Sequence, residues 1–149
     1  MKNRKGIIIL LSRPIISVFG RSRTMKKEIK DLYDLWLKKT EGCAELHDEL
    51  AAIEGKEDEI SDRFYRALEC GTGGLRGVLG AGTNRMNVFT VNQATQGLAD
   101  YLNAKYDSPS VAIAHDSRIN SDVFARGAAG VLAANAVSYT HLRAHETSQ

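Results

Sequence analysis

The sequence predicts an α/β fold in which a helical section precedes alternating strands and helices. Apolar residues recur at helical spacing through residues 29–68. A glycine-dense segment follows at residues 70–87, and a short, wholly apolar run at 111–114 then lies between two further stretches of helical periodicity. Such a run suits a buried strand. With 149 residues, the chain can form one ordinary domain with a modest core.

The first part of the body, residues 25–68, is predicted to form three amphipathic helices. Their apolar positions share the spacing that places side chains on one face of a helix. These positions are Ile29, Leu32, Tyr33 and Trp36 in the first helix, Leu46, Leu50 and Ile53 in the second, and Ile60, Phe64, Ala67 and Leu68 in the third. Gly55 can end the second helix. The many acidic residues of this section are expected to form solvated outer faces.

A strand is expected around residues 75–79, inside the glycine-dense segment. Thr90 and Gln93 then form the pattern of a capping box at the start of a helix. The Ser-Pro dipeptide at 108–109 should end this helix. The positions expected on one side of it are Val91, Ala94, Leu98, Tyr101 and Leu102.

The last predicted elements are the strand at 111–114 and one more helix. A polar string, His-Asp-Ser-Arg at 115–118, follows the strand. Asn120 or Ser121 can cap the helix that comes next. Its inward positions are expected to be Phe124, Ala128, Val131 and Leu132.

Both ends of the chain differ in character from its body. Residues 1–24 carry six basic side chains and no acidic one, and Met25 opens a sequence with a regular helical stripe. We therefore expect residues 1–24 to be a basic leader that is not native, with Met25 as the natural start. The apolar run in this leader stops at Arg13 and Pro14, so it is too short to span a bilayer.

The other end, AVSYTHLRAHETSQ, resembles translated adapter sequence, so residues 137–149 are expected to be an artefactual tail. His141 and His145 have the i, i+4 spacing of a zinc-binding pair on a helix. No third group of ligands accompanies them, so the sequence predicts no metal site in this chain.

The charge of the chain indicates which partners it can bind, and its cysteines indicate its cellular compartment. The formal net charge is +2, and the basic leader accounts for the excess, so that the body is mildly acidic. A mildly acidic body argues against a nucleic-acid-binding surface. Cys43 and Cys70 show neither CxxC spacing nor a metal-type pairing, and they are expected to be reduced thiols of a cytoplasmic protein. No membrane partner is expected.

The glycine-dense segment, CGTGGLRGVLGAGTNRMN, admits several interpretations. A dinucleotide fingerprint would need a glycine where Arg76 stands, and it would need a strand rather than a helix before it. A Walker phosphate loop would need a lysine where Thr83 stands. A plain tight turn, which joins a helix to a strand, stays open on residue type alone.

Four strings in order, GTGGLRG, GAGTNRMNVFTV, ATQGLADYL and AIAHDSRINSDVFA, resemble the first domain of the alpha-D-phosphohexomutase family. The nearest branch is that of bacterial phosphoglucomutases and phosphomannomutases. The resemblance covers about residues 25–135. It implies a three-layer αβα domain I at 69–136, incomplete here and preceded by the N-terminal helices at 25–68. Cys70, where the family usually has phenylalanine, and His115, where an aromatic residue or glycine is more familiar, depart from the pattern.

The resemblance also implies a chemistry. Family members interconvert hexose 1-phosphate and hexose 6-phosphate through an enzyme phosphoserine and a bisphosphate intermediate, with Mg²⁺ held by aspartates. Arg76 is then the expected active-site cation near the phosphoserine, because a guanidinium grips phosphate with two donors. Arg118 is a weaker candidate, and a salt bridge to Asp116 is its alternative. The expected phosphate-binding loop consists of Gly71, Thr72, Gly73, Gly74 and Gly77.

The serine loop of the family, similar to Thr-Ala-Ser-His-Asn-Pro, has no match in this sequence. The chain is therefore expected to be a fragment without mutase activity, and the Mg²⁺ ligands are expected to be absent from it. The parent enzyme is expected to act on a sugar phosphate, and glucose phosphate is the first expectation. A phosphomannomutase or phosphopentomutase parent and a non-catalytic phosphate- or nucleotide-binding α/β module are the alternatives.

Overall fold

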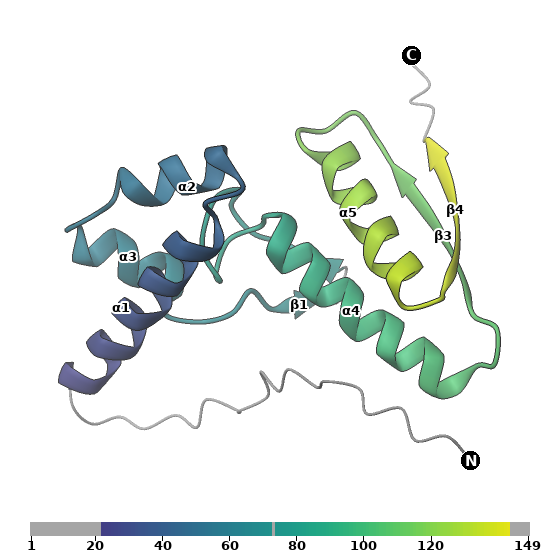
Figure 1. The fold of residues 1–149 in the computed structure, drawn as a ribbon, viewed down its shortest axis with the longest axis horizontal. Coiled ribbons are helices and arrows are strands. Elements are labelled where there is room, and N and C mark those ends of the chain that lie inside the picture. The colour runs from purple at the N-terminus through teal and green to yellow at the C-terminus, as the bar shows by residue number, and fades with distance from the viewer. Residues whose placement is uncertain (1–21, 73, 144–149) are drawn as a thin grey trace.

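The computed structural model describes residues 22–72 and 74–143. Most of the predicted leader, Gly73 of the predicted loop, and residues 144–149 with His145 lie outside the described residues. Figure 1 shows the arrangement of the elements. In chain order these are α1 (Ser22–Lys39), α2 (Ala44–Ala51), α3 (Glu57–Phe64), β1 (Cys70–Gly71), β2 (Gly74–Leu75), α4 (Val88–Lys105), β3 (Ser110–His115), α5 (Ser121–Ala134) and β4 (Ser138–Arg143). The mixed α/β fold with helices first is confirmed.

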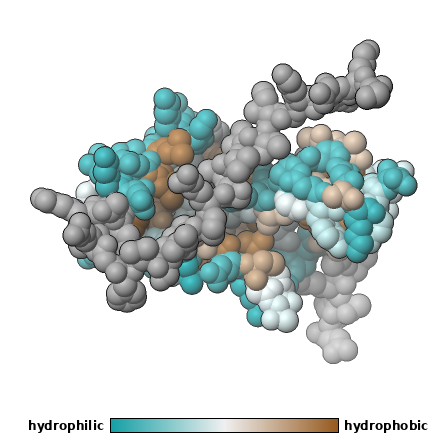
Figure 2. Space-filling view, turned by 90° about the horizontal axis from the view of Figure 1, so that it is seen from below, coloured by the Kyte–Doolittle hydropathy of each residue, from teal (hydrophilic) through white to brown (hydrophobic). Residues whose placement is uncertain are grey.

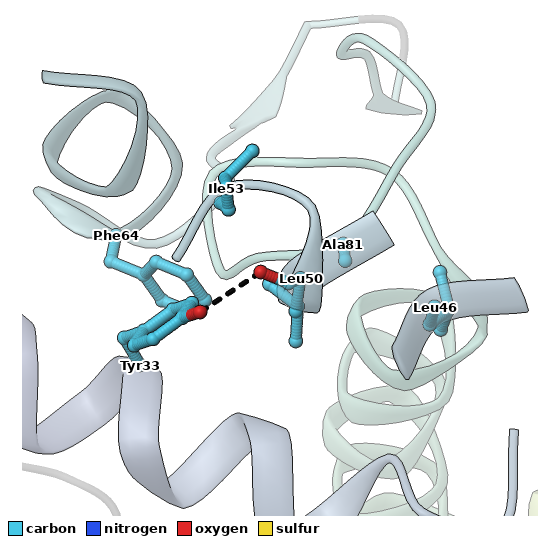
Figure 3. Packing of buried hydrophobic residues seen from close by; sticks show 6 residues of the cluster. All are labelled: Tyr33, Leu46, Leu50, Ile53, Phe64 and Ala81. Atoms are coloured by element: carbon cyan, nitrogen blue, oxygen red, sulfur yellow. Dashed lines mark hydrogen bonds between the residues drawn. The ribbon is translucent and has the colours of Figure 1, made fainter. Parts of the chain in front are cut away.

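The three predicted N-terminal helices are present and enclose an apolar core, which Figure 3 shows from close by. The Phe64 ring lies 6.0 Å from the ring of Tyr33 and 5.7 Å from that of Trp36, both edge to face. Such aromatic pairs stabilise the fold by more than the burial of their apolar surface alone would. The buried members of this core are Tyr33, Leu46, Leu50, Ile53, Phe64 and Ala81.

The third helix is shorter than predicted, because α3 ends at Phe64. Ala67 is exposed and Leu68 is only half-buried. The chain leaves the helix here because its backbone pairs with the later glycine loop: the Leu68 amide donates to the Thr83 carbonyl at 2.7 Å. Tertiary hydrogen bonds thus override the helical periodicity.

The predicted capping box of Thr90 with Gln93 is wrong, because α4 begins earlier with Asn87 as its N-cap. The Asn87 side chain accepts hydrogen bonds from the amides of Phe89 and Thr90, both at 3.1 Å. The Thr90 hydroxyl accepts from the Asn87 amide at 3.0 Å, which closes a reciprocal box. Asparagine is a strong N-cap, and this one also donates to Gly80 and Gly82, which fixes where the helix starts.

The predicted inward face of α4 is also partly wrong. Leu98 and Tyr101 are 44% and 55% exposed, whereas Ala99 is fully buried. Ala99 packs with Leu132 of α5 and with Val137 in a second core cluster. Small residues let α4 and α5 approach closely, so the buried face carries little of the apolar bulk that periodicity detects. Figure 2 shows that apolar residues also reach the surface in patches between hydrophilic ones.

β3 and β4 pair in parallel, from Ser110 with Ser138 to His115 with Arg143. The strand predicted at 111–114 is confirmed, but its burial alternates: Val111 and Ile113 are half-buried, while the residues between and beside them are exposed. The described part of the chain covers one face of this sheet with α5 (Figure 1), so a wholly apolar run is only half-buried here.

α5 confirms the last predicted helix. Asn120 is its N-cap, with φ of 63° and no capping hydrogen bond from its side chain. Of the four predicted inward residues, Leu132 is fully buried and the others are half-buried, while Ala125 and Ala129 complete the buried face.

β4 follows α5 after Val137, which is 2% exposed. The assignment of residues 137–149 to an artefactual tail, like the boundary at Met25, stays a prediction.

Candidate functional site

The first half of the glycine-dense segment forms a two-stranded hairpin, whose first strand is exposed and whose second strand is half-buried. β1 and β2 pair antiparallel, with Cys70 opposite Leu75 and Gly71 opposite Gly74. Gly74 has φ of +100°, which side-chain-bearing residues rarely adopt, so the turn itself requires glycine there. Gly71 and Thr72 are exposed. The strand expected over 75–79 is wrong beyond Leu75, because the residues after it belong to no named strand.

Arg76 comes directly after this hairpin and is exposed. It makes no hydrogen bond or ion pair within the part of the chain that the structure describes. The other arginines whose side chains are described all have a partner; they are Arg63, Arg66, Arg85, Arg118 and Arg126. Its five donors are therefore available to an anion.

Arg118 lies in the loop after the carboxyl end of β3, the edge at which α/β sheets commonly bind ligands. Its Nε donates to Asp116 Oδ2 at 2.6 Å and its amide donates to Asp116 Oδ1 at 3.1 Å. The side-chain hydrogen bond from Arg118 is the main reason why the pKa of Asp116 lies below its ordinary value. The salt bridge that was the alternative interpretation of Arg118 is therefore present. No hydrogen bond or ion pair joins Arg118 to Arg76 among the described residues.

The second half of the glycine-dense segment is packed tightly against the N-terminal helices. A Cβ built on Gly77 would lie 2.7 Å from Leu68 Cδ1, and one on Gly80 would lie 2.6 Å from Glu49 Oε1. A Cβ on Gly82 would lie 2.7 Å from the carbonyl oxygen of Arg63. These glycines permit close packing, whereas Gly71 and Thr72 of the hairpin are exposed. The assignment of Gly71, Thr72, Gly73, Gly74 and Gly77 to phosphate binding stays a prediction.

An ion pair beneath this loop was not anticipated from the sequence, because the acids of the helices were expected to be solvated. Arg63 Nη1 lies 2.5 Å from Glu49 Oε1 and 3.1 Å from the Ala81 carbonyl oxygen. The Ala81 amide donates to Glu49 Oε2 at 2.8 Å. The small-residue string Gly-Ala-Gly at 80–82 was the signal that something packs closely there.

The described residues offer neither a membrane span nor a metal site of the kinds considered next. No helix among them is both long and apolar enough to cross a membrane. They also contain no group of three or more His, Cys, Asp or Glu side chains that could hold a metal ion.

Comparison with known proteins relates this chain to a family of sugar-phosphate mutases. The family model for phosphoglucomutase/phosphomannomutase, alpha/beta/alpha domain I, matches residues 67–148. A phosphoribomutase of Saccharomyces cerevisiae is 37% identical over 113 residues, which cover 74% of this chain and 18% of the yeast protein. A phosphoglucomutase of Staphylococcus saprophyticus is 42% identical over 82 residues, 55% of this chain and 15% of the relative. A phosphoglucomutase of Staphylococcus aureus is 37% identical over 105 residues, 62% of this chain and 19% of the relative.

The chain thus spans less than a fifth of the length of these relatives. No solved structure gave a significant match. The matched region holds the exposed glycine hairpin, Arg76 and the polar loop after β3. On this match, which covers more than half of its residues, the chain belongs to the phosphoglucomutase/phosphomannomutase family through its alpha/beta/alpha domain I.

Proposed function

We propose that this chain is a portion of a cytoplasmic phosphohexomutase that interconverts glucose 1-phosphate and glucose 6-phosphate. The parent enzyme carries a phosphoserine, donates its phosphoryl group to the sugar phosphate, and recovers the other phosphoryl group from the bisphosphate. The observation that supports a role in this chemistry is the guanidinium of Arg76, which is exposed beside a glycine hairpin and has no partner among the described residues.

Arg76 would bind phosphoryl oxygens during transfer. Phosphoryl transfer spreads negative charge over several oxygens, so that a fixed cation stabilises the transition state more than the ground state. A guanidinium suits this task because its planar fork can donate to two oxygens at once. The neighbouring exposed backbone at Gly71 and Thr72 lets a phosphate approach closely.

Mg²⁺ is the cofactor that the family implies. The described residues contain no cluster that fits it, so we assign no ligand in this chain and derive no step through the metal.

A pentose phosphate is the alternative substrate. It is favoured by the 37% identity to the yeast phosphoribomutase, the longest of the alignments given above. Mannose phosphate is the other alternative, since the family model covers phosphomannomutases as well. Assays of the full-length mutase with glucose, mannose and ribose phosphates would rank the three.

The experiment that tests the role of Arg76 compares two variants of the full-length mutase that contains residues 25–136. Loss of one transition-state donor typically costs about two to three orders of magnitude in turnover, so we expect that fall for Arg76→Ala. Arg126→Ala is the matched control, because Arg126 is an exposed arginine whose partner is Asp122 on its own helix. Its turnover should stay normal.

Melting temperatures of both variants are measured on the same preparations. A lower melting temperature with near-normal turnover in Arg76→Ala would mean that Arg76 only holds the loop, and it would remove this residue from the active site. If the full-length protein converted none of the three sugar phosphates, the proposed function itself would be wrong.

A further inference from the structure

The Glu49–Arg63 ion pair does more than join α2 to α3. Residue Ala81 is 0% exposed, and its two backbone polar groups are both satisfied by this pair. Its amide donates to Glu49 at 2.8 Å and its carbonyl accepts from Arg63 at 3.1 Å. Since a buried peptide group without partners is costly, the pair fixes the backbone at this point of the loop.

The backbone on either side of Ala81 lies directly on the same two side chains. Gly80 and Gly82 have φ of +142° and +129°. A Cβ on Gly80 would lie 2.6 Å from Glu49, and one on Gly82 would lie 2.7 Å from the backbone of Arg63. The backbone of the Gly-Ala-Gly string therefore fits in one position, which the Glu49–Arg63 ion pair defines.

The residues that follow this string hydrogen-bond to the chain on both sides of the hairpin. The incoming end is held where the Leu68 amide donates to the Thr83 carbonyl at 2.7 Å. The outgoing end is held where the Met86 amide donates to the Val78 carbonyl at 2.8 Å. Gly77, the residue after Arg76, packs against Leu68, so the two ends also touch each other.

We propose that Glu49 and Arg63 are positioning residues for Arg76. They hold the loop at Ala81, and the residues that follow, up to Met86, hydrogen-bond to the chain before the hairpin and after Arg76. Phosphoryl transfer depends on a cation kept within a fraction of an ångström of its place, and an exposed side chain on a short hairpin keeps that place only if the hairpin base is rigid. This inference rests on the proposed function of Arg76. It adds that the N-terminal helices, outside the region of the family match, set the geometry of the site.

The first test uses the full 149-residue chain and needs no activity. Amide hydrogen exchange is compared between the unaltered chain and Glu49→Gln, which keeps the shape of the side chain and removes its charge. We expect faster exchange at Ala81, Leu68 and Met86, and unchanged exchange in α5. Glu59→Gln is the matched control, because Glu59 pairs with Lys56 on the exposed surface of α3. Unchanged exchange at Ala81 and Leu68 in Glu49→Gln would overturn the proposal.

The second test is a double-mutant cycle in the full-length mutase, with turnover expressed per folded molecule. Glu49→Gln should lower kcat about tenfold when Arg76 is present and less than about twofold in the Arg76→Ala background. Arg63→Lys, which keeps the charge but has a single donor nitrogen, should restore part of the activity lost in Arg63→Met.

The outcomes separate the two proposals. Equal losses in both backgrounds would mean that Glu49 does not act through Arg76, and they would overturn the positioning role while the proposed function stands. Normal turnover in Arg76→Ala alone would instead overturn the assignment of Arg76, and with it the positioning role.

Discussion

Tyr33 shows how one polar atom ties the N-terminal helices together. Its hydroxyl donates to the Leu50 carbonyl oxygen at 2.9 Å, across 17 positions of the chain. The side chain is 4% exposed, and this burial is the main reason why the pKa of its phenol is raised, with Glu54 and Asp34 adding to the effect. The folded chain therefore favours the neutral phenol.

Tyr33→Phe should lower the free energy of unfolding by about 1 kcal/mol at neutral pH, because one buried hydrogen bond is lost. The raised pKa makes this difference depend on pH. Below the unfolded pKa of about 10 the contribution of the phenol is fully present, and it declines as pH rises toward the higher folded pKa. Denaturant unfolding of both forms at about pH 8 and about pH 11 would measure the difference. An equal difference at the two values would contradict the pKa argument.

At the level of elements, the loop between β2 and α4 connects the N-terminal helices to α4. Two of its glycines, Gly80 and Gly82, face Glu49 and Arg63 of the N-terminal helices, and its last residue, Asn87, caps α4. Asn87 also donates to the carbonyls of Gly80 and Gly82 at 2.8 and 3.0 Å. A change in the backbone of this loop should therefore affect both the N-terminal helices and the start of α4.

Gly82→Ala should destabilise the chain by about 2 kcal/mol or more, because the new Cβ meets the Arg63 backbone at a positive φ. Gly97→Ala is the matched control in α4, where a Cβ would meet nothing within 4 Å. Alanine is the better helix former, so this control should raise stability by about 0.5–1 kcal/mol. Thermal melts of Gly82→Ala and Gly97→Ala, each compared with the unaltered chain, test both expectations. A mild effect of Gly82→Ala would show that the loop can shift away from α3.

The sequence predicted the type and order of most elements, because long amphipathic helices and a short apolar strand leave a clear periodic signal. It missed the start of α4, since the Asn87 cap depends on carbonyls of a loop that only the folded chain brings near. It missed the buried face of α4, since Ala99 offers little apolar bulk. It also missed the Glu49–Arg63 pair, because a contact across 14 positions has no local pattern. Arg76 could be proposed only because the family resemblance gave it a role.

The whole described molecule has two core clusters rather than one. One lies among α1, α2 and α3, and the other, with Ala99, Leu132 and Val137, lies between α4, α5 and the sheet. Relatives of this chain are more than five times as long as the part that it matches. A complete catalytic centre for phosphoryl transfer needs groups on both sides of the transferred phosphoryl, and we predict that the family's serine loop is missing from this chain.

We therefore expect no conversion of glucose 1-phosphate by the purified 149-residue chain in the presence of Mg²⁺ and a glucose bisphosphate primer. The chain would be produced in a host that lacks its own mutase, and a full-length relative assayed in parallel would establish that the conditions support turnover. Activity above that of a mock preparation from the same host would contradict the prediction and would require a phosphoryl acceptor among the residues of this chain.

The last prediction concerns the N-terminal segment. Among the described side chains of α1, Lys27 and Glu28 are exposed, and Ile29 is the first that packs against the core. A chain that starts at Met25 keeps every one of these core contacts and loses only the first three residues of α1. Helix ends contribute little to tertiary stability because they fray. The shorter chain should therefore melt within about 2 °C of the full chain, with the same cooperativity and helical circular dichroism per residue. A large loss of helical signal in the shorter form would show instead that residues 1–24 pack on the domain, and a start at Ile29 would then be expected to lower the melting temperature further.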